Sequence, residues 1–157
     1  MPDNYIFKSP IGFLKISEEN NKITSIYLLQ KEYDIGAQNY ERHSDLLYEA
    51  YRQLNEYFSG KRKSFDMPLE YKGTVFQQKV WRELQRIPYG ETRSYEDIAV
   101  SIGKPKTARA IGYANSKNHI MIIIPCHRVI CKSGNISGFI WGSDVKKYLL
   151  DLEKRYI

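Results

Sequence analysis

The sequence predicts an α+β protein. We expect an N-terminal domain of antiparallel sheet plus helix over residues 1–70, and a helical C-terminal domain with a helix-turn-helix over residues 71–157. Short β-type runs separated by turn residues begin the chain, and apolar residues then recur at helical spacing. A chain of 157 residues is long enough for two small domains.

The first three elements are short strands. Apolar and β-favouring residues occupy 5–7, 13–16 and 23–28, and the turn-forming stretches "SPIG" and "ENNK" separate them. We expect an antiparallel meander. A helix over 41–58 follows, because six apolar residues fall on one face and Gly60 then ends the run. These six are Leu47, Ala50, Tyr51, Leu54, Tyr57 and Phe58. A linker is expected near 66–72.

The second half reads mainly as helices. One is expected over 74–86, and Ser94 with Asp97 resembles a capping box that starts another over 95–102. After Gly103 a third short helix spans 106–115. The apolar run 120–124 predicts a buried strand or extended run, 132–135 a turn, and 144–155 a closing helix.

Composition places the chain among soluble globular proteins, with 42% hydrophobic and 27% charged residues. No stretch approaches the roughly 18 apolar residues of a membrane span, and the N-terminus lacks a secretory signal. We therefore expect a cytoplasmic protein without membrane contact. The two cysteines are expected to be thiols there.

Charge is unevenly distributed. Residues 1–71 carry 9 Lys/Arg against 11 Asp/Glu, a net of −2, whereas residues 72–157 carry 15 against 7, a net of +8. A basic half is typical either of a solvated surface or of a surface that binds a polyanion.

The helices around Gly103 could form a helix-turn-helix, or could simply pack together. The second helix is rich in small residues (Ala108, Ala110, Gly112 and Ala114), which would let its backbone approach the DNA minor groove. Arg109 stands among them. It could fill the gap left by an extruded base, contact a phosphate, or pair within the protein.

Cys126 follows an isoleucine run and Pro125 and precedes His127. It could be a buried structural thiol or, with His119, His127 and Cys131, a metal ligand, although the spacing fits a zinc site poorly. It could also be a nucleophile at a strand end, exposed by Pro125, with its pKa lowered by a nearby imidazole.

The motif "PCHRVI" resembles the active-site motif of the O6-alkylguanine-DNA alkyltransferases, the methylated-DNA–protein-cysteine methyltransferases. The stretches "GTVFQQKVW", "IPYGETRSYEDIA", "ARAIGYAN", "IIIPCHRVI" and "KKYLLDLE" occur in the family's order, and "SPIGFLKI" extends the likeness to the first half. The resemblance covers essentially the whole chain.

The resemblance implies direct reversal of DNA damage. The family extrudes O6-alkylguanine from the duplex and moves its alkyl group irreversibly to a cysteine, so that each molecule acts once. The expected partner is double-stranded DNA carrying O6-alkylguanine, with O4-alkylthymine left open. We expect no cofactor and a monomer. Two rivals are a non-catalytic lesion-binding protein, which would lack the cysteine, and a regulator, which would need another domain.

The family's catalytic residues match Cys126 as acceptor, His127 as the base that takes the thiol proton through a water, Glu153 as its orienting carboxylate and Asn118 as a brace of the active-site turn. Adjacent side chains of an extended chain face opposite ways, so Cys126 and His127 could not bond directly, and a water is expected to bridge them. The likeness makes Arg109 the intercalating residue and places Tyr95 beside the lesion. Further DNA contacts expected are Lys106, Thr107, Ala108 and Arg128.

The expected substrate pocket comprises Tyr95, Val129, Ser137, Phe139 and Trp141. Phe139 stands where the family commonly has tyrosine, and Ile140 and Trp141 replace small residues. Trp141 is expected to narrow the pocket or to swing outward over its rim. Ser116 and His119 stand where the family often has Gly and Pro. Some members bind zinc in the N-terminal half, but no cysteine precedes Cys126, so no metal is expected.

Overall fold

A computed structural model describes residues 3–29, 44–136 and 139–157, and these form two compact units, Met1–Tyr71 and Lys72–Ile157. The first unit holds strands β1 (Asp3–Ser9), β2 (Gly12–Glu19) and β3 (Lys22–Leu28) and helix α1 (Asp45–Phe58). The expected meander is confirmed, with antiparallel order β1-β2-β3. Asn20 and Asn21 both have positive φ in the two-residue turn between β2 and β3, as a turn that matches the strand twist requires.

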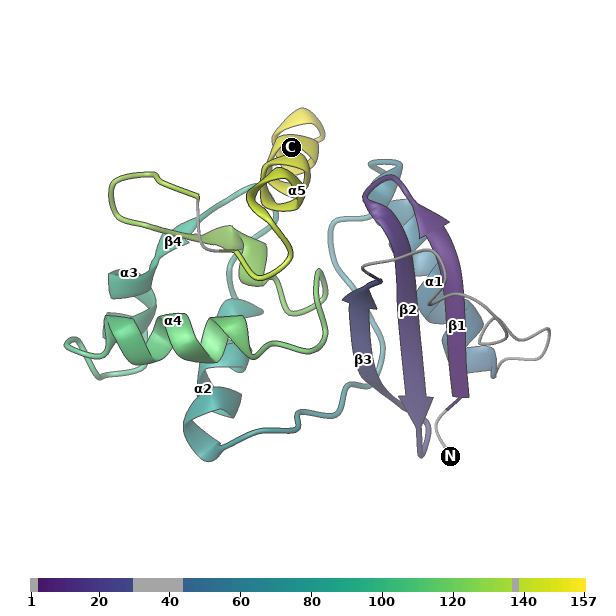
Figure 1. Ribbon diagram of the computed structural model, residues 1–157, viewed down its shortest axis with the longest axis horizontal. Helices are drawn as coiled ribbons and strands as arrows, with labels where there is room; N and C mark the ends of the chain where they lie inside the picture. Colours follow the sequence, from purple (N-terminus) through teal and green to yellow (C-terminus); the bar gives the residue numbers. More distant parts are fainter. Residues whose placement is uncertain (1–2, 30–43, 137–138) are drawn as a thin grey trace. The chain divides into compact units, whose positions relative to one another are not determined.

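Helix α1 packs against the three strands of the sheet (Figure 1). The Ser44 hydroxyl caps it by accepting the amide N–H of Leu47 at 3.1 Å, so the helix begins at Asp45. Residues 41–43, where its start was expected, lie outside the described part. Its buried face includes Leu47, Leu54 and Tyr57, close to the expected set, and meets Ile16 and other core residues of the sheet.

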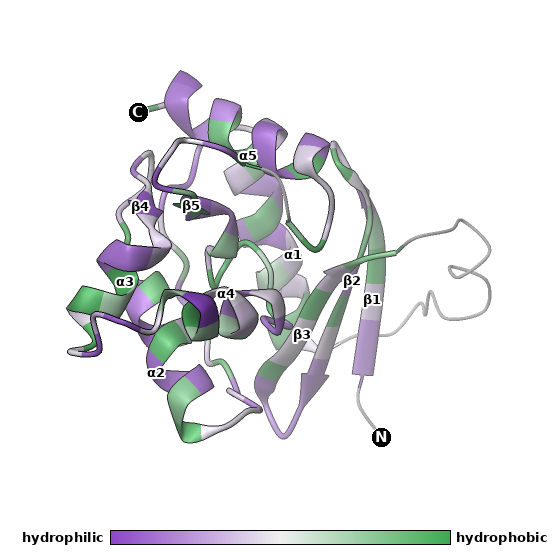
Figure 2. Cartoon of the chain, turned by 60° about the vertical axis from the view of Figure 1, so that its left-hand side comes forward, coloured by the Kyte–Doolittle hydropathy of each residue, from purple (hydrophilic) through white to green (hydrophobic). Residues whose placement is uncertain are grey.

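The second unit holds helix α2 (Val75–Leu84), strand β4 (Arg93–Ser94), helices α3 (Tyr95–Ser101) and α4 (Ala108–Ser116), the 3₁₀ turn η3 (Cys126–Arg128), strand β5 (Val129–Ile130) and helix α5 (Ser143–Arg155). In Figure 2 apolar and polar residues alternate along these helices, as expected where one face is buried. None of the helices in the described ranges is long and apolar enough to cross a membrane.

Capping boxes fix where two of these helices, α2 and α3, start. The predicted capping box of Ser94 and Asp97 is confirmed, with both hydrogen bonds near 3 Å, and Thr74 with Gln77 forms a second one. Gly103, at φ +79°, closes the C-terminus of α3, and α4 packs against α3, which gives the expected helix-turn-helix arrangement. The parallel pair β4–β5 sets Ser94 beside Ile130, and so brings the start of α3 to the segment after Cys126.

Candidate active site

The segment before Cys126 is not the buried strand that its isoleucines suggest. The amide N–H of Ile123 donates to the carbonyl of Met121 at 2.9 Å across Ile122, whose φ is +74°. This is a γ-turn of positive φ, a strained conformation for a β-branched residue. The N–H of Cys126 then donates to the carbonyl of Ile124 at 2.7 Å across Pro125, which is an inverse γ-turn. Burial of the whole run overrides its β propensity.

Asn118 holds this double turn closed. Its Oδ1 accepts the amide N–H of Ile120 at 2.9 Å, and its Nδ2 donates to the carbonyl of Ile124 at 2.8 Å. The side chain is buried, gives the Ile120 N–H its partner, and is a second donor to the Ile124 carbonyl, which also accepts the Cys126 N–H. Asn118 therefore lies where the resemblance expects a brace, between the end of α4 and Cys126.

Cys126 is buried at the start of η3, with 1% of its surface exposed, and is not presented at a strand end. Burial raises the pKa of its thiol to about 11, although the Asn118 side chain and the Lys146 ammonium each lower it. The prediction that the pKa of the Cys126 thiol is lowered is therefore wrong, because the loss of hydration outweighs the effect of the nearby positive charge. The resting group is a thiol.

His127 and Glu153 form a buried pair. Nε2 of His127 lies 2.6 Å from Oε2 of Glu153. Burial raises the pKa of Glu153, but its interactions with His127 and Arg128 lower it further, to well below the usual range. Burial also lowers the pKa of His127, so the imidazole is neutral. Nε2 must then carry the hydrogen, and Nδ1, which has no protein partner among the described residues, keeps a basic lone pair.

Arg128 belongs to this buried network, so its expected contact with DNA is corrected. Only 6% of the residue is exposed. Its guanidinium donates to both carboxylate oxygens of Glu153, at 2.8 and 3.1 Å, and to the carbonyl of Ile87 at 2.8 Å. Because the carboxylate is buried, it draws in a cation that the sequence alone would place on the surface.

Lys146 is a site residue that the sequence reasoning missed. It is 1% exposed, and its Nζ donates to the carbonyl of Val129 at 2.5 Å and lies 5.4 Å from the ring centroid of Phe139. Burial lowers its pKa, whereas the two cysteine thiols raise it. Helical spacing from Leu149 and Leu152 places this lysine on the buried face of α5, and that was the available signal.

The expected pocket residues are partly gathered around the thiol. Tyr95 is half-buried, and its pKa is raised by burial, then by Cys131 and Cys126, which places it beside both cysteines. Val129 and Phe139 meet at Lys146. Trp141 is half-buried in the turn before α5, and its role as a gate stays a prediction. Ser137 lies outside the described residues.

The four side chains considered as metal ligands do not lie together. They are His119, Cys126, His127 and Cys131. His119 packs edge-on against Trp81, with ring centroids 5.2 Å apart, and its Nε2 accepts the backbone N–H of Lys72 at 3.5 Å. His127 is held by Glu153. In the part of the chain that the structure describes, no group of three His, Cys, Asp or Glu side chains could hold a metal ion.

Helix α4 and the two residues before it carry four of the expected DNA-binding residues. Arg109 and Lys106 are exposed, and Thr107 and Ala108 are half-buried. The guanidinium of Arg109 forms no ion pair or hydrogen bond with any described residue. The small residues do not all face solvent, since Ala114 is buried and Gly112 packs towards the Tyr95 ring.

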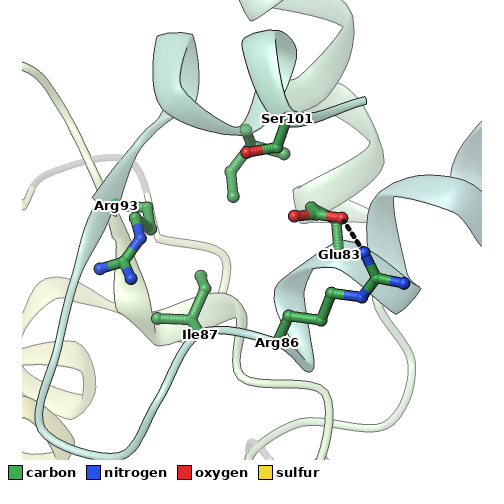
Figure 3. A pocket seen from close by; sticks show the side chains of 6 residues that line it. Glu83, Arg86, Ile87, Arg93 and Ser101 are labelled. Carbon is green, nitrogen blue, oxygen red and sulfur yellow. Dashed lines mark hydrogen bonds and ion pairs between the residues drawn. The ribbon is translucent and has the colours of Figure 1, made fainter. Parts of the chain in front are cut away.

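Two surface hollows lie near this machinery, and Cys126 lines neither. One, of about 230 Å³, lies between α2 and α3 and includes Ile87 and the pair Arg86–Glu83, 3.5 Å apart (Figure 3). The other, of about 320 Å³, is lined by Ser94, Cys131 and Lys132 among others. The thiol is thus closed off from both hollows.

Comparison with known proteins matches both units. The family model "6-O-methylguanine DNA methyltransferase, ribonuclease-like domain" matches residues 5–71, and "6-O-methylguanine DNA methyltransferase, DNA binding domain" matches residues 75–155. A constitutive methylated-DNA–protein-cysteine methyltransferase of Bacillus subtilis is 47% identical over 152 residues, covering 94% of this chain and 92% of the relative. A Methanosarcina barkeri methylated-DNA–protein-cysteine methyltransferase is 48% identical, covering 95% of each.

Solved structures give the same picture. The crystal structure of Mycobacterium tuberculosis O6-methylguanine methyltransferase has a TM-score of 0.88 at 43% identity, covering 100% of this chain and 95% of that one. The structure of Mycobacterium tuberculosis OGT in complex with DNA has a TM-score of 0.87 at 42% identity, covering 98% and 93%.

Proposed function

Since the chain belongs to the 6-O-methylguanine DNA methyltransferase family, we propose that Cys126 is the residue that accepts the alkyl group it removes from DNA. The protein is a direct-reversal DNA repair protein: it transfers the alkyl group of O6-alkylguanine irreversibly to its own cysteine, once per molecule. The assignment to Cys126 is carried by one observation, the buried thiol next to a neutral imidazole whose Nδ1 is available.

The step needs only this chain and the lesion. The thiol proton passes to Nδ1 of His127 through a bridging water, which reconciles a neutral imidazole with a thiol whose own pKa is about 11. The thiolate attacks the alkyl carbon, a sulfur–carbon bond forms, and the carbon–oxygen bond breaks with its electron pair leaving on guanine O6. A proton then neutralises the guanine. The thioether product has no good leaving group, so the protein is spent.

The neighbours stabilise the charges that this step creates. Glu153 accepts the Nε2 hydrogen bond of His127 and is already ionised, so it favours the imidazolium that forms. The ammonium of Lys146 favours the thiolate, and the Asn118 side chain both holds the turn and lowers the pKa of the thiol. We assign these four side chains to charge stabilisation and positioning around Cys126.

Helix α4 presents the lesion to this site. Arg109 is exposed on it and pairs with none of the residues that the structure describes, so it is available to fill the base stack when the damaged nucleotide is extruded. Tyr95 lies between α4 and the cysteines, because Gly112 of α4 packs towards its ring. The extruded base would therefore be received beside Tyr95. We also place the protein in the cytoplasm, where the free thiols of Cys126 and Cys131 would stay reduced.

The test is mass spectrometry after mixing the protein with duplex DNA that carries O6-methylguanine. We expect the wild type to gain the mass of one CH₂ on the peptide containing Cys126, with removal of methyl groups ending at one per protein. Cys126→Ser should gain nothing, and Cys131→Ser, the matched control, should react as the wild type does. Turnover beyond one equivalent, or label on Cys131, contradicts the assignment.

A further inference from the structure

Helix α4 carries an exposed line of three residues that the chemistry above does not fully use. Arg109, Tyr113 and Lys117 are spaced four residues apart and therefore lie on one face, which we call the α4 ridge. Lys117 is the residue that caps the helix C-terminus. All three residues are exposed, and Figure 1 shows α4 at the front of its unit.

Tyr113 has no role in the core. It is 61% exposed, whereas the buried face of α4 consists of Ile111, Ala114 and Asn115. Its ring instead supports a cation, because Nζ of Lys117 lies 5.2 Å from the ring centroid. An exposed aromatic ring that orients an ammonium offers an apolar surface and a positive charge side by side.

We propose that the α4 ridge is a contact line for one DNA strand beyond the extruded nucleotide, with Lys117 binding a backbone phosphate and the Tyr113 ring packing on the sugar that precedes it. This rests on the proposed function, because it takes Arg109 as the residue in the base stack. Tyr113 and Lys117 then extend the footprint along the strand and fix the register of α4 on the duplex.

The dimensions and charges fit a DNA strand. Eight residues of helix span about 12 Å, which equals the rise of three to four base pairs. Two of the three side chains are cationic, and neither forms an ion pair with a described residue. The intervening ring matches the apolar edge of a deoxyribose. The ridge also belongs to the half of the chain whose net charge is +8.

A second explanation is purely structural: a lysine at a helix C-terminus interacts favourably with the helix dipole. The two explanations differ in what they predict. A structural role would lower the thermal unfolding midpoint and leave DNA affinity unchanged, whereas a strand contact would change affinity and its dependence on salt.

The experiment measures affinity for an unmodified duplex over a range of salt concentrations, together with the thermal midpoint. Lys117→Gln should reduce the slope of log affinity against log salt by about 0.9, the share of one phosphate. Tyr113→Ala should weaken binding about fivefold to tenfold, since ring contact and lysine orientation are both lost. Tyr113→Phe keeps the ring and should bind as the wild type does. Tyr48→Ala and Lys22→Gln, exposed residues of the other unit, are the matched controls.

The proposal is overturned if Lys117→Gln and Tyr113→Ala bind the duplex with wild-type affinity and slope, or if only their thermal midpoints fall. Because the duplex is undamaged, no alkyl transfer enters the measurement. Failure of Cys126 to accept a methyl group would refute the proposed function and leave this binding result standing. Normal methyl transfer with unchanged binding in both variants would refute the ridge alone.

Discussion

At the scale of single residues, the site keeps the thiol protonated at rest, and the reactive thiolate forms only when the thiol gives up its proton. Cys126 is held in the unreactive form by burial, and the groups that favour its ionisation are the Asn118 side chain and the Lys146 ammonium. His127 is neutral and already donates Nε2–H to an ionised carboxylate. Proton transfer from thiol to imidazole therefore changes no net protonation, and the reactive pair can form without releasing a proton to solvent.

We predict that the rate of methyl transfer is nearly independent of pH around neutrality in the wild type. It should fall only in acid, where the lowered pKa of His127 is finally crossed. In His127→Gln the thiol must lose its proton to solvent, so the rate should be about 100-fold lower at neutral pH and should rise about tenfold per pH unit towards 11. Rapid-quench transfer assays across pH measure this. The same flat profile in both proteins would show that His127 takes no proton.

Lys146 allows a second test at this scale. Lys146→Met keeps the length of the side chain and removes the charge, so the pKa of Cys126 should rise above about 11 and transfer should slow about tenfold. Lys147→Met is the control, because Lys147 is exposed and pairs with Asp151 on the surface of α5. The thiolate absorbance of each variant, titrated with pH, gives the pKa directly. An unchanged thiol pKa in Lys146→Met would exclude an electrostatic role.

At the scale of elements, the strained segment 120–126 connects α4 to η3. Each of its two γ-turns is closed by one short-range backbone hydrogen bond, and Asn118 adds bonds to the N–H of Ile120 and the carbonyl of Ile124. The positive φ of Ile122 is kept because the surrounding side chains are fully packed. The position of the thiol thus depends on one amide side chain at the end of α4, the helix assigned to DNA.

Asn118→Ala should destabilise the protein by about 1–3 kcal/mol, because the buried N–H of Ile120 loses its partner and the carbonyl of Ile124 keeps only the Cys126 N–H. Asn115→Ala is a matched control: Asn115 is also buried, but among the described residues its side chain makes one long hydrogen bond, of 3.4 Å from Nδ2 to the carbonyl of Cys126, so about 1 kcal/mol is expected. Guanidinium unfolding of the full chain measures both. Equal losses in the two variants would mean that Asn118 is not the main brace.

At the scale of the whole molecule, the buried ionisable network links stability to pH. The pKa of His127 is lowered on folding, so the unfolded chain binds a proton first, and stability should fall as pH drops below about 6.5. The pKa of Glu153 is also lowered. Its contribution is therefore full above about 4.3, the unfolded value, and is lost as pH falls further towards the folded pKa.

We predict that the unfolding free energy of the wild type falls over two ranges of acid pH, which we call the first and second limbs. The first limb lies between about pH 6.5 and 4.3, with a slope of up to about 1.4 kcal/mol per pH unit. His127→Gln cannot take up this proton, so its first limb should be flat, while the second remains. Urea unfolding at a series of pH values measures the slopes. A first limb of equal slope in His127→Gln would assign it to another group.

The sequence by itself determined most of the local structure and the choice of Cys126 as the proposed acceptor. Alternating apolar residues specified the three strands, Ser94 and Asp97 specified a helix start, and the stretch around Cys126 identified the family, because each signal depends on neighbours a few residues away. The tertiary structure decided the rest. Burial turned the isoleucine run into γ-turns, raised the thiol pKa, moved Arg128 from the expected DNA surface into the site, and brought in Lys146, for which the sequence predicted no role. These outcomes follow from contacts between distant segments: Glu153 on α5 sets the place of Arg128, and a desolvated environment sets the charge state of Cys126, which no local pattern encodes.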